Sequence, residues 1–582
     1  MDSTAYTFIG TKIRLKPTKE QEILLWKSAG CSRFIYNWAL DKEADNYEKG
    51  NKFIKGTLIL GAAGVIIKLL GAVFRIPLGS LIGSEGMGYY QTAYPVYALF
   101  LTLATAGFPT AIAKLVSEQV ALGNHKGANE IFKITHIMLF ATGLVMFIIL
   151  FFGADFIVSN VQHNPSAVTA MRAIAPALLI VPSMSAYRGY YQGYQQMSRI
   201  AISQIFEQIF RVFLGLGLAY VLMKQFGPKL GAAGGISGAT IGAFASFLFL
   251  VLVYLKDTKK RKTMISESVG YVKKPMGEIV ENILWVVLPI SIGACIMPLV
   301  NVVDSVIVIM RLKVAGYTLL SANSLFGQLT GMSMPIIAMP MVFTTAIGMS
   351  LVPAISESYA LKDYNQARHN AKLAIKITLL LLLPCAFGLA SLSTPIMALL
   401  FPKQTGVTLG MILFTLSPAC IFLGLLYTFN GILQGMGKPM VPVVALLCGI
   451  VGKIVVSYVL TAIPSINILG SAFGTLVSYV IAAAIEYVYI KKSLKLQFNQ
   501  MEFFIKPLLV VMLMFVAARL SYIGMAIFLN TKIATLIAIS IGGLVYVFGI
   551  LGFGGITQEE ILAMPKGNKL LAKLKKYRLI RG

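Results

Sequence analysis

Residues 232–254 read AAGGISGATIGAFASFLFLVLVY and contain no charged side chain. A helix needs about 20 consecutive, mostly apolar residues to cross the roughly 30 Å hydrocarbon core of a bilayer. This stretch therefore predicts a membrane-spanning helix. Further apolar stretches of similar length precede and follow it, separated by short polar segments, and none alternates like a membrane β-strand. The chain is predicted to be an all-α, polytopic membrane protein.

The composition of the chain favours the same class. Of its 582 residues, 57% are apolar and 13% are charged, and the mean hydropathy is +0.78. A water-soluble core could not bury so much apolar side chain. The five cysteines lie singly and the four histidines share no ligand spacing, so neither disulfides nor a metal site is expected. The loops lack acidic clusters and the Gly-x-x-x-x-Gly-Lys-Ser/Thr motif of ATP-driven pumps, so we expect no catalytic residues, no cofactor and no enzyme activity.

Charged residues divide the chain into fourteen predicted spans, two sets of six followed by two more. The predicted spans are 56–83, 92–114, 134–154, 166–187, 200–223, 232–254, 283–310, 329–355, 377–400, 405–428, 439–463, 466–489, 507–528 and 533–555. The predicted domains are an N-terminal segment 1–51, a first lobe 52–255, a basic loop 256–282, a second lobe 283–491, and a C-terminal part 492–582 with helices 13 and 14 and a basic tail.

The distribution of basic residues predicts the orientation. Of the 50 Lys and Arg residues, 38 fall in the connections on the side of both termini and 6 in the opposite connections. By the positive-inside rule, both termini and the loop 256–274 face the cytoplasm of a multi-pass cell-membrane protein. The net charge of +27 is then explained by topology and by attraction to anionic membrane lipids, and it is not evidence for a nucleic-acid partner.

An internal repeat relates the two predicted lobes. The pattern Ser-Glu-x-x-Ala-Leu at 117–122 recurs at 356–361, and Gly-x-x-Gln-Gly at 189–193 recurs at 431–435. The other recurring positions, in the same order in both halves, are Pro176 with Pro418, Arg211 with Lys453, and Gly238 and Gly242 with Gly470 and Gly474. Each unit contains an even number of spans, so the halves share one orientation. Parallel repeats of this kind place a substrate site between the halves and allow alternating access by rocking.

Ionisable side chains within predicted spans are costly and therefore mark candidate sites. Lys68 and Arg75 lie seven residues apart on one face of the first span, about 10 Å apart along its axis and without an acid in that span. The positive side chains outnumber the negative ones, which predicts an anionic ligand. The candidates are Lys68, Arg75, Arg211, Lys453 and Arg519 against Glu207 and Asp304. For Lys68, Arg75 and Arg519 the alternative is that the side chain extends to the membrane interface.

Two ion pairs are predicted among these residues. Glu207 and Arg211 are four residues apart and can neutralise one another on one helix. Asp304 is the acid of the seventh span and Lys453 is the base of the eleventh, and both spans belong to the second lobe. Burying either charge alone costs several kcal/mol, so we expect Asp304 and Lys453 to pair. The alternative is that Lys453, as the repeat counterpart of Arg211, contacts substrate.

The first 55 residues differ from the rest, with ten basic and seven acidic residues and both Trp26 and Trp38. Apolar residues at helical spacing on either side of Gly30 predict two short helices around a turn. Residues 12–18 and 30–38 resemble the N-terminal helix-turn-helix of TnpB-type accessory transposases. This resemblance implies a truncated fragment fused in frame, because nothing after residue 55 can supply the acidic nuclease domain. A retained DNA-binding role is the alternative for this segment.

Other motifs resemble the multidrug/oligosaccharidyl-lipid/polysaccharide (MOP) exporter superfamily. Gly86–Gln91 and the six-plus-six repeat are similar to the superfamily in general. Residues 55–60 (KGTLIL), 75–78 (RIPL) and 207–212 (EQIFRV) resemble its stage V sporulation protein B and lipid II flippase family. The resemblance implies export of an undecaprenyl-diphosphate-linked glycan precursor, lipid II-like, for peptidoglycan, spore cortex or another polysaccharide.

The resemblance also implies roles for individual residues. Lys68 and Arg75 would contact the diphosphate, and Asn301 with Asp304 matches a sodium-site motif of lipid II flippases. The chain departs from that pattern because the eleventh span brings Lys453 where sodium ligands would be expected, so we expect its ammonium to replace sodium. A basic residue is also lacking in the eighth span, where those flippases carry an arginine. The expected partners are an anionic lipid-linked oligosaccharide and membrane lipids, and the expected state is a monomer. A cation-coupled drug antiporter of the same fold is the alternative, but its cavity should be acidic.

Overall fold

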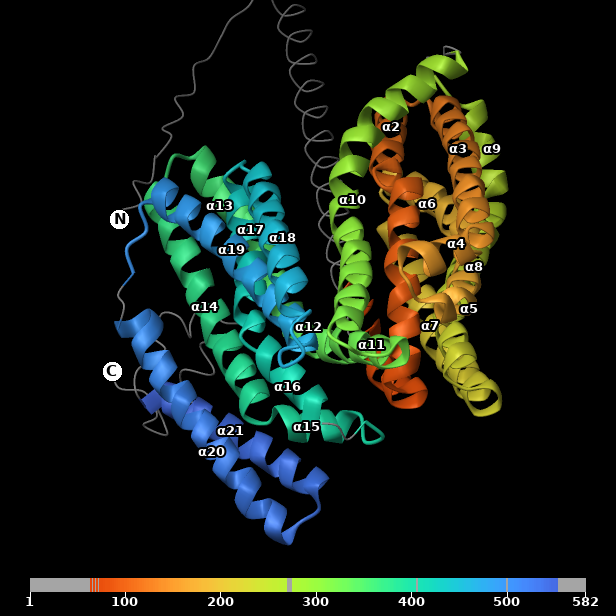
Figure 1. Cartoon of the computed structure of the whole chain (residues 1–582). Helices are drawn as coiled ribbons and strands as arrows, with labels where there is room; N and C mark the ends of the chain where they lie inside the picture. The colour runs from red at the N-terminus through yellow and green to blue at the C-terminus, as the bar shows by residue number, and fades with distance from the viewer. Residues whose placement is uncertain are drawn as a thin grey trace, which may run out of the picture. The chain divides into compact units, whose positions relative to one another are not determined.

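The structure is a computed structural model that describes residues 63–64, 66–67, 70–71, 73–269, 275–404, 407–498 and 501–552. The helix-turn-helix predicted for residues 1–51 lies outside these residues, as does Lys68. Within the described ranges the chain is built from helices and contains no strand, which confirms the all-α prediction (Figure 1). Thirteen helices of the described chain are long and apolar enough to cross a membrane.

Thirteen such helices correspond to fourteen predicted spans because one helical stretch, Val73–Ala121, holds the end of the first predicted span and all of the second. Its backbone turns at Gly83 and Gly107, which have φ angles of 71° and 79°. Glycine adopts this left-handed conformation without a steric penalty, so the chain can change direction here. The earlier part of the first predicted span falls mostly outside the described residues.

The first lobe comprises the helical residues 73–105 and the helices up to α8. α7 packs along α8, while α6 packs against α2 and α3. The helices of this lobe are α2 (Phe108–Ala121), α3 (His125–Phe152), the short α4 (Ala154–Phe156), α5 (Val168–Ile174), α6 (Ala177–Gly193), α7 (Met197–Phe226) and α8 (Pro228–Lys256). The short basic helix α9 (Thr258–Ser266) follows them.

The second lobe runs from α10 to α19. α18 packs along α19, and α17 packs against α13 and α14. The helices are α10 (Met276–Val314), α11 (Leu319–Phe326), the π-helix η3 (Gly327–Ser333), α12 (Met334–Ala338), α13 (Met341–Ala360), α14 (Tyr364–Ser391), α15 (Ser393–Leu400), α16 (Val407–Leu416), α17 (Ala419–Gly435), α18 (Met440–Leu460) and α19 (Ile468–Leu494). Two more helices, α20 (Lys506–Phe528) and α21 (Thr531–Gly552), pack on each other and, through α20, on α14.

The packing repeats between the lobes as the sequence repeat requires. Pro176 separates α5 from α6, and Pro418 separates α16 from α17 in the same way. Gly193 lets α6 approach Val116 of α2, because a Cβ at Gly193 would lie 2.6 Å from that side chain. In the second lobe, a Cβ at Gly435 of α17 would likewise lie 2.7 Å from the side chain of Ile355 on α13. Duplicated sequence therefore produces duplicated helix packing.

Two helices extend well beyond their predicted spans. α10 has 39 residues, about 58 Å at 1.5 Å per residue, and so is longer than a bilayer is thick. α14 begins at Tyr364, thirteen residues before the predicted span 377–400, because a helix can continue through charged residues once it leaves the membrane. α10 contacts α2 and α3 of the first lobe and α18 and α19 of the second, so it lies between them (Figure 1).

Candidate functional site

A cavity of about 240 Å³ lies between the two lobes. Its wall is formed by the helical residues 73–105, the middle of α10, η3, and the facing sides of α18 and α19. A second pocket of about 390 Å³ adjoins it and shares Arg75 and Met334 with it. The cavity thus lies where parallel repeats are expected to hold a substrate.

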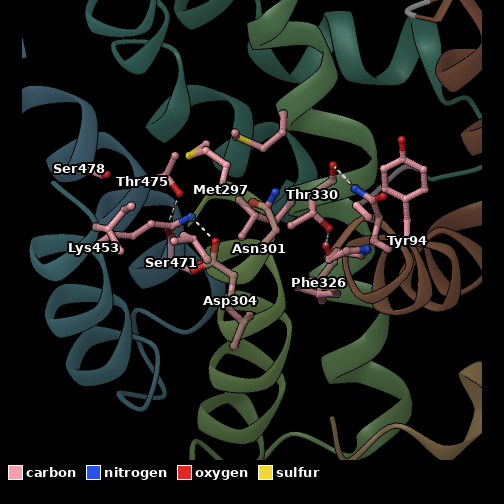
Figure 2. A pocket seen from close by; sticks show the side chains of 18 of the residues that line it. Tyr94, Met297, Asn301, Asp304, Phe326, Thr330, Lys453, Ser471, Thr475 and Ser478 are labelled. Atoms are coloured by element: carbon pink, nitrogen blue, oxygen red, sulfur yellow. Dashed lines mark hydrogen bonds and ion pairs between the residues drawn. The ribbon is translucent and has the colours of Figure 1, made fainter. Parts of the chain in front are cut away.

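Among the α10 residues that line this cavity, Met297, Asn301 and Asp304 carry the side chains with polar or sulfur atoms (Figure 2). Their spacing of four and three residues places them on one side of a helix. Lys453 reaches across from α18, and its Nζ forms an ion pair with the Asp304 carboxylate. The two side chains are 13% and 14% exposed. The structure therefore contains the Asp304–Lys453 pair expected from the sequence, and Lys453 also lines the cavity.

Arg75 is the cation of the first lobe that lines the cavity. Its side chain is half-buried and borders both adjoining pockets. Within the described part of the chain it makes no hydrogen bond and no ion pair, so its five N–H donors are available to a ligand. The structure does not test whether Lys68 faces the same space, because Lys68 is outside the described residues.

Arg211 lies behind the cavity wall. Its guanidinium is 5.7 Å from the centroid of the Tyr94 ring, and Tyr94 in turn lines the cavity. Tyr94 is stacked on Tyr90, with their ring centroids 5.8 Å apart. A cation over an aromatic face is attracted to it without losing its charge. Arg211 can therefore add positive potential to the cavity, although it is not a lining residue.

The predicted pair between Glu207 and Arg211 is wrong. Arg188 of α6 forms an ion pair with the Glu207 carboxylate at 2.9 Å, and its guanidinium also donates to the hydroxyls of Ser203 and Ser246 at 3.1 Å each. Arg188 is not among the predicted candidates because the predicted span ended at residue 187, whereas α6 continues to Gly193. Contacts between neighbouring helices outweigh the four-residue spacing here, because the partly buried guanidinium of Arg188 binds Glu207, Ser203 and Ser246 at once.

Buried amides connect the lobes at one end of the cavity. Asn164 donates to Asn323 at 2.7 Å, and Gln162 donates to Ser305 at 2.8 Å. All three amide residues have 0% exposure. Gln91 also donates to the carbonyl of Thr330 at 2.7 Å. These contacts, which we call the polar gate, join residues 143 to 239 positions apart in the chain.

Glycines allow the backbones to meet at the polar gate. A Cβ on Gly88 would lie 2.2 Å from the carbonyl oxygen of Asn323, and one on Gly327 would lie 2.2 Å from that of Ser84. Gly327 begins the π-helix η3, and π-helical turns are often found at functional sites. Not every polar atom of the gate is hydrogen-bonded, because Gln162 Oε1 and Asn164 Oδ1 are buried without a partner among the described residues. Unpartnered acceptors lower the net free energy gained on closure.

The charges that line the cavity among the described residues are Arg75, Lys453 and Asp304, and the last two neutralise one another. Arg519 does not belong to this site, since it is exposed on α20 and donates to the carbonyl of Ser391 at 3.3 Å. The described part of the chain holds no group of three or more His, Cys, Asp or Glu residues that could bind a metal. The arrangement therefore favours an anion.

Two repeated helical lobes around a charged cavity define a multi-pass membrane protein with the architecture of a secondary transporter. Comparison with known proteins agrees with this class. Residues 53–359 match the polysaccharide biosynthesis protein family, and residues 289–459 match the MatE family. The chain belongs to the polysaccharide biosynthesis protein family of the MOP exporter superfamily. Residues 8–52 match a helix-turn-helix domain of the OrfB/IS605 type, which confirms the resemblance noted for the N-terminal segment.

Similar proteins include two from Bacillus subtilis (strain 168). Stage V sporulation protein B is 28% identical over 534 residues, covering 90% of this chain and 99% of that protein. Lipid II flippase MurJ is 28% identical over 454 residues, covering 76% of this chain and 83% of that protein.

Solved structures show the same fold at lower identity. A lipid II flippase MurJ in an inward closed conformation superposes with a TM-score of 0.63 at 16% identity, covering 84% of this chain and 98% of that one. An inward-facing multidrug resistance MATE family transporter superposes with a TM-score of 0.59 at 15% identity, covering 74% and 98%.

Proposed function

We propose that this protein is a flippase that moves an undecaprenyl-diphosphate-linked glycan precursor, such as a lipid II-like molecule, across the cell membrane by alternating access. The observation that carries the proposal is Arg75, a half-buried cation in the cavity between the lobes that forms no ion pair or hydrogen bond with any described residue. A diphosphate provides the negative charge that such a guanidinium lacks, and guanidinium–phosphate contacts are strong and directional.

The two relatives support the proposal at the level of substrate class. One of them is named as a lipid II flippase and the other as a sporulation protein. A lipid-linked substrate fits a site that lies within the membrane, where its charged headgroup needs a cationic cavity and its chain can remain in lipid. Arg75 and Lys453 are the proposed headgroup contacts. Arg211, which lies over the Tyr94 ring behind the cavity wall, would add positive electrostatic potential. The glycan and its pathway are not specified by these residues.

The proposed orientation places both termini in the cytoplasm, as the basic loops predict. The polar gate then lies toward the outer surface, since it joins the connections after the odd-numbered spans. The described conformation is accordingly closed at the outer end. Transport would require the polar gate to open as the lobes rock. The acceptors of Gln162 and Asn164 that lack a partner among the described residues lower the free-energy cost of opening it.

A cation-coupled drug antiporter is the second candidate, and the MatE match over residues 289–459 favours it. Such a protein needs a free acid in its cavity to attract a cation. Asp304 is the acid among the described lining residues, and Lys453 already neutralises it. The charge of the cavity therefore supports the flippase over the antiporter.

Depletion in the native host tests the proposed function. When expression is switched off, a lipid-linked oligosaccharide should accumulate in the cytoplasmic leaflet, and re-expression should clear it. Unchanged levels of every lipid-linked intermediate after depletion would contradict the proposal, and increased sensitivity to cationic drugs in its place would favour the antiporter.

A further inference from the structure

A separate pocket lies at the end of the first lobe, where the α6–α7 turn meets α8 and α9. Its volume is about 80 Å³. Tyrosines form much of its wall, with Tyr191 and Tyr194 from the end of α6 and Tyr254 from α8. No residue lines both this pocket and the central cavity. We call it the tyrosine pocket.

The tyrosine pocket carries excess positive charge. It is lined by Arg199, Lys260 and Arg261 against one acid, Asp257. Arg199 forms an ion pair with Asp257, and its guanidinium lies 4.9 Å from the centroid of the Tyr191 ring. Lys260 is exposed and forms no hydrogen bond within the described part of the chain. Two of the three cations are therefore without an acidic partner.

Arg261 is held in one orientation at this pocket. Its guanidinium lies 3.6 Å from the centroid of the Tyr254 ring, donates to the Tyr254 carbonyl at 2.8 Å and donates to Thr258 Oγ1 at 3.3 Å. A guanidinium has five N–H donors, so further donors remain for a ligand. Because the protein already fixes the side chain, a ligand would not have to order it on binding.

A buried hydroxyl in the pocket lacks a well-formed hydrogen bond. Tyr191 is 2% exposed, and its Oη makes no hydrogen bond of normal distance and angle with any described residue, although the Arg199 guanidinium lies close enough to interact with it. Buried polar groups are usually hydrogen-bonded, and an unmade bond costs about 1–3 kcal/mol. Gln196 Oε1 is also buried without a partner, and rotation of that amide would present an NH₂ donor instead. The Tyr191 hydroxyl and a rotated Gln196 amide would both donate hydrogen bonds to a ligand that is rich in acceptors.

The internal repeat shows that the fold does not require these polar side chains. Gly193 and Gly435 make equivalent packing contacts at the equivalent turns of the two lobes. The second lobe nevertheless has apolar residues at the positions that correspond to Tyr190, Tyr191, Tyr194 and Arg199. Those residues are, in the same order, Ile432, Leu433, Met436 and Val441. The polar pocket is thus specific to the first lobe and calls for an explanation other than folding.

We propose that the tyrosine pocket binds a phosphate group, supplied by an anionic phospholipid headgroup or by a free phosphate compound, at the membrane face that carries the basic segment α9. Positively charged, donor-rich walls suit a phosphate, which has only acceptors when ionised. A volume of about 80 Å³ holds roughly five to eight water-sized spheres, enough for the five heavy atoms of a phosphate but too little for a whole sugar nucleotide. This site is distinct from the flippase cavity and does not depend on the proposed transport.

The test uses the purified full-length protein in detergent and follows its thermal unfolding. Short-chain phosphatidylglycerol is added in increasing concentration, with short-chain phosphatidylcholine as the reference. Inorganic phosphate is added in the same way, with chloride at equal ionic strength as the reference. Saturable stabilisation by phosphatidylglycerol beyond phosphatidylcholine identifies a lipid headgroup, and saturable stabilisation by phosphate beyond chloride identifies a free anion. Either result supports the site when the variants below weaken the apparent affinity of the ligand that stabilises the protein.

Tyr191→Phe removes only the buried hydroxyl, and Arg261→Gln removes a fixed cation. Each should weaken the apparent affinity about tenfold, the value of one hydrogen bond to a charged group. If Arg261→Gln does not fold, Lys260→Gln combined with Tyr191→Phe provides the same comparison. The matched control is Lys259→Gln with Lys262→Gln, which removes two exposed charges of α9 outside the pocket and should leave the affinity unchanged.

Two results would overturn the proposal. One is that neither ligand stabilises the protein beyond its phosphatidylcholine or chloride reference. The other is that the control variant loses as much affinity as the pocket variants, because the attraction would then come from the overall charge of the basic face.

Discussion

Lys453 of α18 forms an ion pair with Asp304 of α10 in the wall of the central cavity, although the two residues are 149 positions apart in the chain. The pair neutralises the acid that lines the cavity among the described residues and leaves Arg75 as an unpaired lining cation. The Asp304–Lys453 contact thus leaves the net positive charge of the cavity to Arg75 and connects α10 to α18 within the second lobe.

Breaking this pair from one side should destabilise the protein. Removing one partner of a buried pair typically costs about 3–5 kcal/mol, whereas removing both can be nearly neutral. We expect Lys453→Ala to lower the unfolding temperature, and Asp304→Asn combined with Lys453→Ala to recover part of the loss. Thermal unfolding of the purified variants checks this. If the loss of stability in the double variant equals the sum of the losses in the two single variants, the pair makes no net contribution to stability.

Transport should be independent of sodium. The Lys453 ammonium contacts the carboxylate that a sodium ion would need, so the described lining of the cavity offers a cation no free acid. Replacing sodium with potassium on both sides of the membrane should leave the transport rate unchanged. A rate that follows the imposed sodium gradient would show that the ion pair opens during the cycle.

Arg75 should be required for activity. Loss of a charge-assisted contact to a phosphate costs about 1.5–3 kcal/mol, which corresponds to roughly tenfold to hundredfold weaker binding. Arg75→Ala should therefore fail to complement a flippase-deficient strain while reaching the membrane in normal amounts. Arg519→Ala is the matched control, because that arginine is exposed on α20, away from the cavity. Full complementation by Arg75→Ala would remove Arg75 from the site.

Locking the polar gate should stop transport. In a background without the native cysteines, Asn164→Cys with Asn323→Cys places thiols where the side-chain amides now meet at 2.7 Å. Oxidation should form a disulfide between the lobes and abolish transport, and reduction should restore it. The control pair is Thr92→Cys with Asn164→Cys, two residues of the first lobe whose side chains meet at 3.0 Å. Transport that persists with the lobes cross-linked would contradict alternating access.

The N-terminal segment should be dispensable for transport. Residues 1–51 have no counterpart in the repeat, and the helix-turn-helix match ends at residue 52. A variant that lacks residues 1–51 should insert normally and complement as well as the full chain. Normal insertion with lost transport would show that the segment contributes to the transporter.

The helical membrane fold could be predicted from the sequence because long uncharged stretches have few alternatives in a membrane. The repeat predicted equivalent packing, and Pro176 and Pro418 do divide equivalent helices. The ends of α6 and α14 were predicted less well, because a helix does not have to end where its apolar segment ends. That error hid Arg188 and led to the wrong partner for Glu207.

Long-range polar contacts show where sequence patterns stop being informative. The cost of burying a lone charge was sufficient to predict that Asp304 and Lys453 pair, since each is the ionisable residue of its span. The polar gate had no such signal. Asn164 and Asn323 are uncharged, lie at span ends, and are brought together only when two distant lobes pack through Gly88 and Gly327.

Reconstitution measures directly whether this protein moves a diphosphate-linked precursor across a membrane. Purified protein in proteoliposomes is given an undecaprenyl-diphosphate-linked precursor, and the glycan's accessibility to a membrane-impermeant reagent is followed with time. We predict protein-dependent translocation that falls at least about tenfold in Arg75→Ala, the loss expected for one phosphate contact, and is unchanged in Arg519→Ala. A precursor that stays in its original leaflet would contradict the proposed flippase activity, and an uncharged undecaprenol-linked glycan that crosses equally fast would contradict recognition of the diphosphate.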